Sequence, residues 1–154
     1  MSIELKRLDI KKMEMIDLDE VLNIETFSSS HPWSKNMFIE EMKNPLAYCF
    51  IIIMQGIAEH KVMGFICFRK IEDESELLNI CVHPQYRKMG IAKRLMDFYI
   101  EFCRKREIKS FYLEVNASNQ PAVHLYHLFF YQSLGRRKKF YQGKFDALLM
   151  VKKI

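Results

Sequence analysis

The sequence contains no apolar run long enough to cross a membrane. Its longest apolar stretch, Ala47–Met54, has the length of a strand, whereas a membrane-spanning helix needs about 20 residues. Residues 1–7 contain no apolar segment of the kind that a secretory signal peptide carries. We therefore expect a cytoplasmic protein.

Metal-binding and disulfide patterns are also absent from the sequence. The cysteines occur singly, with no Cys-x-x-Cys pair, at Cys49, Cys67, Cys81 and Cys103. This spacing supports neither a zinc site nor a disulfide framework, and it is typical of small buried thiols in a reducing compartment. His124 and His127 stand close on one predicted helix, but no third ligand lies near them and the His-Glu-x-x-His pattern is missing. We predict no bound metal.

The charge of the chain does not identify a partner. The 24 basic and 19 acidic side chains give a net charge of +5, which admits a nucleic acid, an acidic ligand or a ribosome-associated protein. The basic residues gather at residues 87–94 and at residues 136–139. The second group is typical of a solvated strand edge.

The 154 residues are expected to form one domain, residues 1–154, because the chain is long enough for a single core and contains no repeat or linker. Apolar patterning predicts strands within residues 8–16 and at residues 47–54, 62–71, 77–82, 110–115, 131–138 and 145–151. It predicts helices at residues 17–27, 35–43, 90–104 and 119–130. Short turns near residues 55–61 and 72–76 make the strands that they join antiparallel. The helix at residues 90–104 implies a parallel pair between the strands that it connects.

Local signals add detail to this outline. Asp17, with an acidic residue three positions later, predicts a helix N-cap, and Ser34 and Asn119 predict two more. Glu41 is predicted to face solvent, and Gly64 is predicted to mark a bulge.

Residues 82–95 predict a phosphate-binding turn. The preceding strand runs into Pro84, which cannot donate to a ladder and therefore ends the strand. Gly90 then opens a helix with apolar residues at helical spacing. The free amides at a helix N-terminus, together with the positive end of the helix dipole, favour a phosphate group. An ordinary strand-to-helix turn with a solvated basic face is the alternative.

The same stretch resembles the acetyl-CoA motif of the GNAT N-acetyltransferases through Val82-x-Pro84-x-Tyr86-Arg87-x-x-Gly90-x-Ala92. It is neither a Gly-x-Gly-x-x-Gly fingerprint nor a P-loop. The resemblance narrows to the RimI-like alanine N-acetyltransferases, which act on the N-terminus of a small-subunit ribosomal protein, through Leu113-Glu114-Val115-Asn116-Ala117-Ser118-Asn119-x-x-Ala122-x-x-Leu125-Tyr126. Trp33-Ser34 after a proline and the ending at residues 141–150 also match, so the resemblance covers residues 17–150.

This resemblance implies the α/β GNAT fold, in which helices flank a mixed, mostly antiparallel sheet and the two central parallel strands splay apart to admit CoA. It implies acetyl-CoA as co-substrate and direct transfer in a ternary complex, with Glu114 as general base and Tyr126 as general acid. The residues that it implies for CoA binding are Ile80, Cys81, Val82, Arg87, Lys88, Met89, Gly90, Ile91, Ala92, Lys93 and Asn119. Trp33 and Tyr141 are implied to border the groove for the acceptor.

Acetyl transfer to an amine needs such groups on chemical grounds. A protein α-amino group has a pKa of about 8 and is largely protonated at pH 7, so a base must remove a proton before the nitrogen can attack. Backbone amides can bind the carbonyl oxygen, and an acid can protonate the departing thiolate. Taken alone, Glu114 is typical of a strand residue that faces solvent, and Tyr126 is typical of a core residue. Trp33, taken alone, is typical of a large side chain that only fills the core (a core plug). The joint spacing of Glu114 and Tyr126 after the Gly90 motif favours the catalytic interpretation of those two residues.

We therefore predict an enzyme that acetylates a protein N-terminus, with the N-terminal alanine of a ribosomal protein as acceptor and no required contact with nucleic acid or membrane. Two other hypotheses remain: a GNAT enzyme acting on a lysine side chain or a small amine, and a non-catalytic CoA-binding or ribosome-binding module.

Two positions depart from the family pattern. Ala92 stands where many members have glycine, which the motif tolerates. Phe130, which we place on the apolar face of its helix with Val123 and Tyr126, replaces a glycine that normally ends this helix with a positive φ. We therefore expect a reshaped helix exit next to Tyr126.

Overall fold

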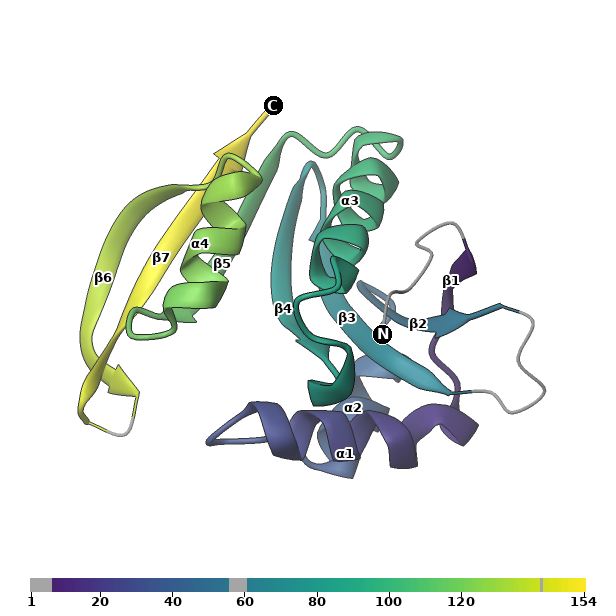
Figure 1. Cartoon of the computed structure of the whole chain (residues 1–154). Helices are drawn as coiled ribbons and strands as arrows, with labels where there is room; N and C mark the ends of the chain where they lie inside the picture. Colours follow the sequence, from purple (N-terminus) through teal and green to yellow (C-terminus); the bar gives the residue numbers. More distant parts are fainter. Residues whose placement is uncertain (1–6, 56–60, 142) are drawn as a thin grey trace.

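The computed structural model describes residues 7–55, 61–141 and 143–154 (Figure 1). Most of the turn predicted near residues 55–61, and most of the N-terminal segment, lie outside the described residues. The helices and strands are, in chain order, β1 (Leu8–Lys12), α1 (Leu18–Ser28), α2 (Lys35–Lys43), β2 (Ala47–Met54), β3 (Val62–Ile71), β4 (Glu74–Val82), α3 (Ile91–Arg104), β5 (Ser110–Asn116), α4 (Gln120–Leu128), β6 (Gln132–Tyr141) and β7 (Phe145–Lys153). Short 3-10 turns precede α1 (Met15–Asp17) and follow β4 (Pro84–Tyr86).

The described strands form one seven-stranded sheet in the order β1-β2-β3-β4-β5-β7-β6. The central pair, β4 and β5, is parallel and joined through α3, whereas every other neighbouring pair is antiparallel. This arrangement confirms the predicted mixed α/β fold with one parallel pair.

The parallel strands β4 and β5 pair over only part of their length. Their ladder ends at the pair Leu77–Leu113, whereas β4 stays paired with β3 as far as Val82. The shift in register between β3 and β4 makes Leu78 the extra residue of a bulge. Because a bulge bends its strand and increases the local twist, it turns β4 away from β5 at this point. Figure 1 shows the two strands diverging toward α1.

Helices cover the two faces of the sheet unequally (Figure 1). On one face, α3 and α4 bury a cluster that includes Phe68, Tyr99, Phe111 and Tyr126. On the other face, α1 and α2 pack against β2, β3 and β4. Full burial of each large apolar side chain contributes about 1.5–3 kcal/mol, so these clusters fix the helices against the sheet. Among the described elements, the face of β5, β7 and β6 opposite α4 carries no helix.

Several local predictions are confirmed. The Ser34 hydroxyl accepts the amide of Met37 at 3.2 Å and caps α2, and the Asn119 side chain accepts the amide of Ala122 at 3.3 Å and caps α4. The predicted bulge at Gly64 appears as a register shift between β2 and β3 beside this residue.

Asp17 directly precedes the first residue of α1, as predicted for its N-cap, but its side chain does not cap this helix. Its carboxylate instead accepts the amide of Glu14 at 2.8 Å, because the 3-10 turn Met15–Asp17 comes directly before α1. The capping bond therefore closes the earlier turn.

The predicted exposure of Glu41 is also wrong. This residue is buried on α2 and forms two 2.7 Å hydrogen bonds with the guanidinium of Arg69 on β3. A bidentate pair of this kind supplies the bonds that a buried carboxylate needs, and its partner lies too far along the sequence for a helical pattern to indicate it.

The strand β4 begins earlier than predicted, at Glu74 instead of Leu77. Ser75 and Leu77 face the core while Glu74 and Glu76 point outward, so the acidic residues belong to the ladder with β5. The acidic turn shortens accordingly to Glu72 and Asp73.

None of the described helices is both long and apolar enough to cross a membrane.

Candidate active site

The end of β4 offers backbone groups that the sheet leaves unused. Past Leu77, no ladder joins β4 to β5 among the described residues, so Ile80, Cys81 and Val82 pair only with β3. These three residues are half-buried. Backbone amide and carbonyl groups on the open side of a strand can bind an extended ligand as they would bind another strand. This is the position at which the sequence predicts the pantetheine arm.

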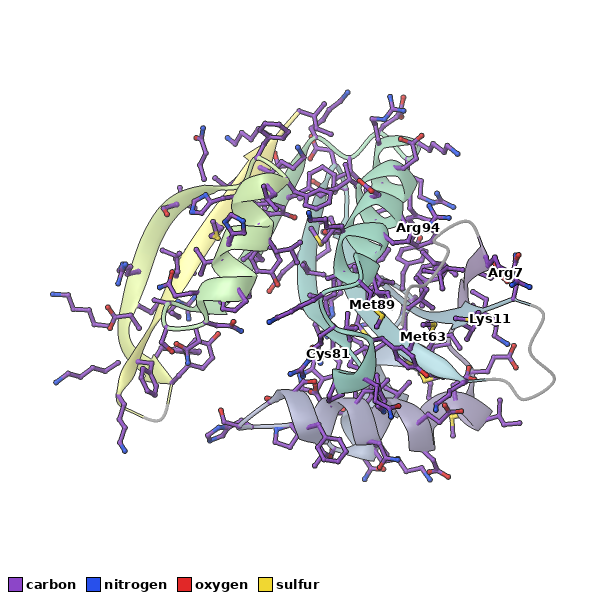
Figure 2. All side chains as sticks on the ribbon, viewed as in Figure 1. Arg7, Lys11, Met63, Cys81, Met89 and Arg94 are labelled. Carbon is purple, nitrogen blue, oxygen red and sulfur yellow. The ribbon has the colours of Figure 1, made fainter. Side chains whose placement is uncertain are left out.

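The turn after β4 forms an anion-binding arrangement of backbone amides. Lys88 and Gly90 both adopt the left-handed conformation, with φ of 62° and 82°. Gly90 begins α3 and provides no side-chain cap for the first amides of the helix. Backbone that alternates in this way directs successive N–H groups toward one point, here at the positive end of the α3 dipole. Figure 2 labels Met89 in this turn, below the first residues of α3.

The side chain of Arg87 contacts neighbouring elements. Its guanidinium donates to the carbonyl oxygen of Val82 at 3.4 Å and to the hydroxyl of Ser28 at 3.1 Å. Ser28 is the last residue of α1. These two bonds hold the turn against α1, and the predicted contact of Arg87 with CoA stays a prediction.

The strand β5 places Glu114 on the face opposite α4. Its neighbours Leu113 and Val115 are buried in the cluster beneath α4, and side chains alternate along a strand. The Glu114 side chain is 30% exposed, and its Oε1 lies 3.1 Å from Nη2 of Arg137 on β6. The predicted base is therefore both accessible and ion-paired.

Tyr141 lies at the end of β6 and is half-buried. Partial burial, and then the negative charge of Glu114, raise the pKa of the Tyr141 phenol. Tyr141 in turn contributes to the raised pKa of Tyr126. The three residues therefore interact electrostatically, and their place in one site stays a prediction.

Tyr126 is buried, with 7% of its surface exposed. Burial is the main cause of its strongly raised pKa, and the neighbouring Cys81 and Tyr141 add to the effect. A phenol with a raised pKa keeps its proton at neutral pH, so Tyr126 does not act as a base there.

The helix exit after Tyr126 is not reshaped, and the expectation that Phe130 would disturb it is wrong. Phe130 adopts a φ of 67°, its amide donates to His127 at 3.0 Å, and the amide of Tyr131 donates to Tyr126 at 3.1 Å. These are the two hydrogen bonds of the usual glycine-terminated exit. Phe130 is 78% exposed instead of facing the core, and its left-handed conformation costs about 1–2 kcal/mol.

A buried carboxylate that the sequence prediction missed lies behind the end of β4. Glu25 on α1 is 2% exposed. It accepts hydrogen bonds from the backbone amide of Trp33 at 2.9 Å, from Nδ2 of Asn79 at 3.0 Å and from Sγ of Cys81 at 3.4 Å. An acidic residue on the apolar face of the predicted helix was the signal that could have revealed it.

Glu25 and the residues around it affect the protonation of Cys81 and the packing of Trp33, two residues that the sequence predicts for the site. Burial and the Glu25 carboxylate raise the pKa of the Cys81 thiol, which therefore stays protonated and is a poor nucleophile. The ring of Trp33 packs on Phe38 with centroids 5.0 Å apart, which favours the core-plug interpretation of this side chain. Its predicted place at the acceptor groove stays a prediction.

Asn119 is exposed, and its side-chain oxygen caps α4. Only its amide nitrogen is therefore left to contact a ligand. Of the two histidines on α4, His127 bonds through Nδ1 to the carbonyl oxygen of Tyr131 at 3.1 Å, and His124 is exposed. Within residues 7–55, 61–141 and 143–154, no group of three His, Cys, Asp or Glu side chains is placed to hold a metal ion.

A groove lies elsewhere on the described part of the chain. It has a volume of about 780 Å³ and is lined by residues of α2, β2 and the end of α3, among them Met42, Tyr48 and Phe102. None of the residues predicted for the site lines it. It is therefore separate from the candidate active site.

Known proteins resemble this chain over most of its length. Residues 16–130 match the acetyltransferase (GNAT) family. The chain is 33% identical over 144 residues to a Bacillus subtilis (strain 168) protein provisionally named ribosomal protein bS18-alanine N-acetyltransferase, with 92% of each chain covered. It is 29% identical over 144 residues to the ribosomal protein bS18-alanine N-acetyltransferase of Escherichia coli (strain K12), with 92% of this chain and 94% of the relative covered.

The fold is similar as well. The crystal structure of the ribosomal-protein-S18-alanine N-acetyltransferase from Escherichia coli aligns with a TM-score of 0.86 at 29% identity, over 96% of this chain and 94% of that one. This likeness confirms the predicted GNAT fold.

Proposed function

The chain belongs to the acetyltransferase (GNAT) family, and we propose that it acetylates the N-terminal α-amino group of a protein, with the N-terminal alanine of a small-subunit ribosomal protein as its acceptor. As a GNAT acetyltransferase, it takes the acetyl group from acetyl-CoA. The names of the two relatives support this acceptor, because each protein matches this chain over more than nine-tenths of its length.

One structural observation carries the proposal: the break in the β4–β5 ladder opens directly beside Glu114. The ladder ends at Leu77–Leu113, and Glu114 is the next residue of β5. We take the open edge of β4, the uncapped N-terminus of α3 at Gly90 and the accessible carboxylate of Glu114 as parts of one site. The strand edge can bind the arm that carries the thioester, the helix N-terminus can bind the pyrophosphate, and the carboxylate can bind the amine.

The residues that would hold acetyl-CoA follow from this arrangement. When bound, acetyl-CoA supplies an activated acetyl group. The open edge of β4 at residues 80–82 fits the extended pantetheine arm, and the amides at residues 88–93 fit the pyrophosphate. The amide nitrogen of Asn119 is available for a further contact.

Glu114 is proposed as the general base. The acceptor arrives largely as an α-ammonium group at pH 7, and a carboxylate on the open face of β5 attracts this cation and can take its proton, directly or through a water molecule. The neutral nitrogen then attacks the acetyl carbonyl carbon, and the bond between that carbon and sulfur breaks. Backbone amides at the end of β4 are suitable donors to the carbonyl oxygen.

Tyr126 is proposed as the general acid. Burial raises the pKa of its phenol, which therefore carries its proton at neutral pH. In the proposed mechanism this proton goes to the departing sulfur. No cysteine nucleophile takes part, which agrees with the raised pKa of Cys81.

The acceptor is proposed to enter between the α1–α2 loop and the β6–β7 hairpin, where Trp33 and Tyr141 border its path. We further propose that the enzyme works in the cytoplasm as a single domain. Contact with nucleic acid or membrane is not needed for this chemistry.

The test is thiol release from acetyl-CoA in the presence of different acceptors. Peptides that begin with Ala, Ser or Met are compared with an N-acetylated Ala peptide, free lysine and spermidine. We expect turnover with the Ala peptide and none once its N-terminus is blocked. The Glu114→Gln variant should lose most of this turnover while it still binds acetyl-CoA.

Each contrary result would identify a different error. Activity limited to lysine or spermidine would keep the fold and refute the protein N-terminus as acceptor. Acetyl-CoA binding without turnover on any acceptor would support a binding module. Unchanged turnover of Glu114→Gln would remove this residue from the mechanism.

A further inference from the structure

The ion pair between Glu114 and Arg137 crosses an intervening strand. Glu114 lies on β5 and Arg137 on β6, and β7 runs between them in the sheet. Nη2 of Arg137 nevertheless lies 3.1 Å from Oε1 of Glu114. An arginine on the edge strand therefore reaches two strands inward to the carboxylate proposed as the base.

The register of the three strands explains this reach. Arg137 pairs with Ala147 on β7, and Ala147 pairs with Asn116 on β5. Directly paired residues share a face, as do residues two apart on one strand, so Arg137, Ala147 and Glu114 lie on the same face. Ala147 pairs with Arg137, and its methyl group leaves room for the arginine side chain to extend over β7 toward Glu114.

Aromatic packing also restrains the arginine. Its guanidinium carbon lies 5.5 Å from the ring centroid of Phe140, in a cation–π contact. The Arg137 side chain is 56% exposed, so a lone surface ion pair of this type would contribute little to stability. The two contacts together give the guanidinium a defined place beside Glu114.

The closest contact of the pair joins Nη2 of Arg137 to Oε1 of Glu114. A carboxylate held beside a guanidinium has a restricted orientation. Orientation of this kind is what a general base needs, since small misplacements of a reacting group can cost up to about a hundredfold in rate.

From this geometry we propose that Arg137 is a positioning residue for acetyl transfer: its guanidinium holds the Glu114 carboxylate in place to receive the proton of the acceptor amine. The proposal rests on the role of Glu114 in the proposed function.

The chain provides a matched control one residue away. Arg136 is also on β6, is 57% exposed and forms an ion pair of 3.3 Å, but its partner is Asp146 and it lies on the other face of the sheet. Replacing either arginine by glutamine removes one positive charge and one ion pair from the same strand. Only the change at Arg137 touches the proposed base.

The experiment measures kcat and KM for Arg137→Gln, Arg136→Gln, Glu114→Gln and the double variant Arg137→Gln/Glu114→Gln on an Ala-starting peptide. We expect kcat to fall about tenfold for Arg137→Gln, with no rise in KM for the peptide or for acetyl-CoA, and to stay near the parent value for Arg136→Gln. In the Glu114→Gln background, the loss of Arg137 should have no further effect. Millimolar guanidinium should restore activity to Arg137→Ala.

The outcomes separate this inference from the proposed function. If Arg137→Gln behaves like Arg136→Gln while Glu114→Gln is impaired, the base assignment stands and the positioning role is refuted. If Glu114→Gln is fully active, both are refuted. A higher peptide KM with unchanged kcat, or no rescue by guanidinium, would show that Arg137 only shapes the groove and would overturn the inference.

Discussion

Glu25 on α1 accepts a hydrogen bond from the side chain of Asn79 on β4, 3.0 Å away. The same carboxylate accepts the amide of Trp33 and the thiol of Cys81. One buried residue therefore connects the first helix, the loop after it and the strand whose open edge forms the candidate cofactor site. The helix and the strand are far apart in sequence, and this contact fixes their relative position.

Replacement of Glu25 by alanine should destabilise the fold by about 2–4 kcal/mol. The change leaves the backbone amide of Trp33 and the side-chain amide of Asn79, two half-buried residues, without this acceptor, which is costly. Urea unfolding measures the effect. As a control, Glu40→Ala on the exposed face of α2 should change the free energy of unfolding by less than about 0.5 kcal/mol. Equal effects at the two positions would contradict the role assigned to Glu25.

Replacement of Phe130 by glycine should stabilise the protein relative to Phe130→Ala by about 1 kcal/mol. Both variants lose the contact of the phenyl ring with Lys152, so their difference isolates the backbone at a φ of 67°. Glycine adopts this conformation without strain, whereas alanine does not. Thermal unfolding of the pair gives the comparison, and a more stable alanine variant would refute the strain.

Replacement of Gly90 by valine should weaken acetyl-CoA binding at least about tenfold, a loss of about 1.4 kcal/mol. A side chain at this position strains the left-handed backbone and blocks approach to the first amides of α3. Gly143→Val is the control, because Gly143 also has a positive φ, of 66°, and a side chain there would meet open space. Calorimetric titration with acetyl-CoA should separate the two variants. Equal affinities would remove Gly90 from the cofactor site.

Replacement of Tyr131 by phenylalanine should reduce the alkaline sensitivity of folding. Burial raises the pKa of Tyr131 in the folded protein above its ordinary value of about 10. The stabilising contribution of the protonated phenol is therefore complete below about pH 10, and it is lost as the pH rises above that value because the unfolded chain then releases the proton first. The slope of unfolding free energy against pH should shrink by about 1.4 kcal/mol per pH unit above pH 10. An unchanged slope would contradict the prediction.

Much of the candidate site could be predicted from the sequence because its parts are local. The alternation of Leu113, Glu114 and Val115 determines which side chain leaves the core, and the order of strand, Gly90 and helix places free amides at a helix start. Ser34 and Asn119 act as caps through hydrogen bonds that span three residues. Such features depend on spacing along one element, which the sequence contains directly.

Other features depend on where separate elements meet, and the sequence does not contain that information. The pairing of Glu41 with Arg69 joins residues 28 positions apart, and the helical pattern by itself indicated solvent. Phe130 takes the conformation of the glycine it replaces because the hydrogen bonds of the helix exit and the surrounding fold outweigh its local strain. In each case tertiary contacts reverse a local preference.

The sequence by itself determined the fold class. It predicted the phosphate-binding turn and, through the family resemblance, the two residues proposed for acid–base chemistry. Only the tertiary structure decided how that chemistry is supported. A bulge at Leu78 separates β4 from β5, and the placement of β7 between β5 and β6 brings Arg137 across Ala147 to Glu114. The reason is geometric: strand order and register set which faces and ends coincide, and neither follows from the spacing of residues within one strand.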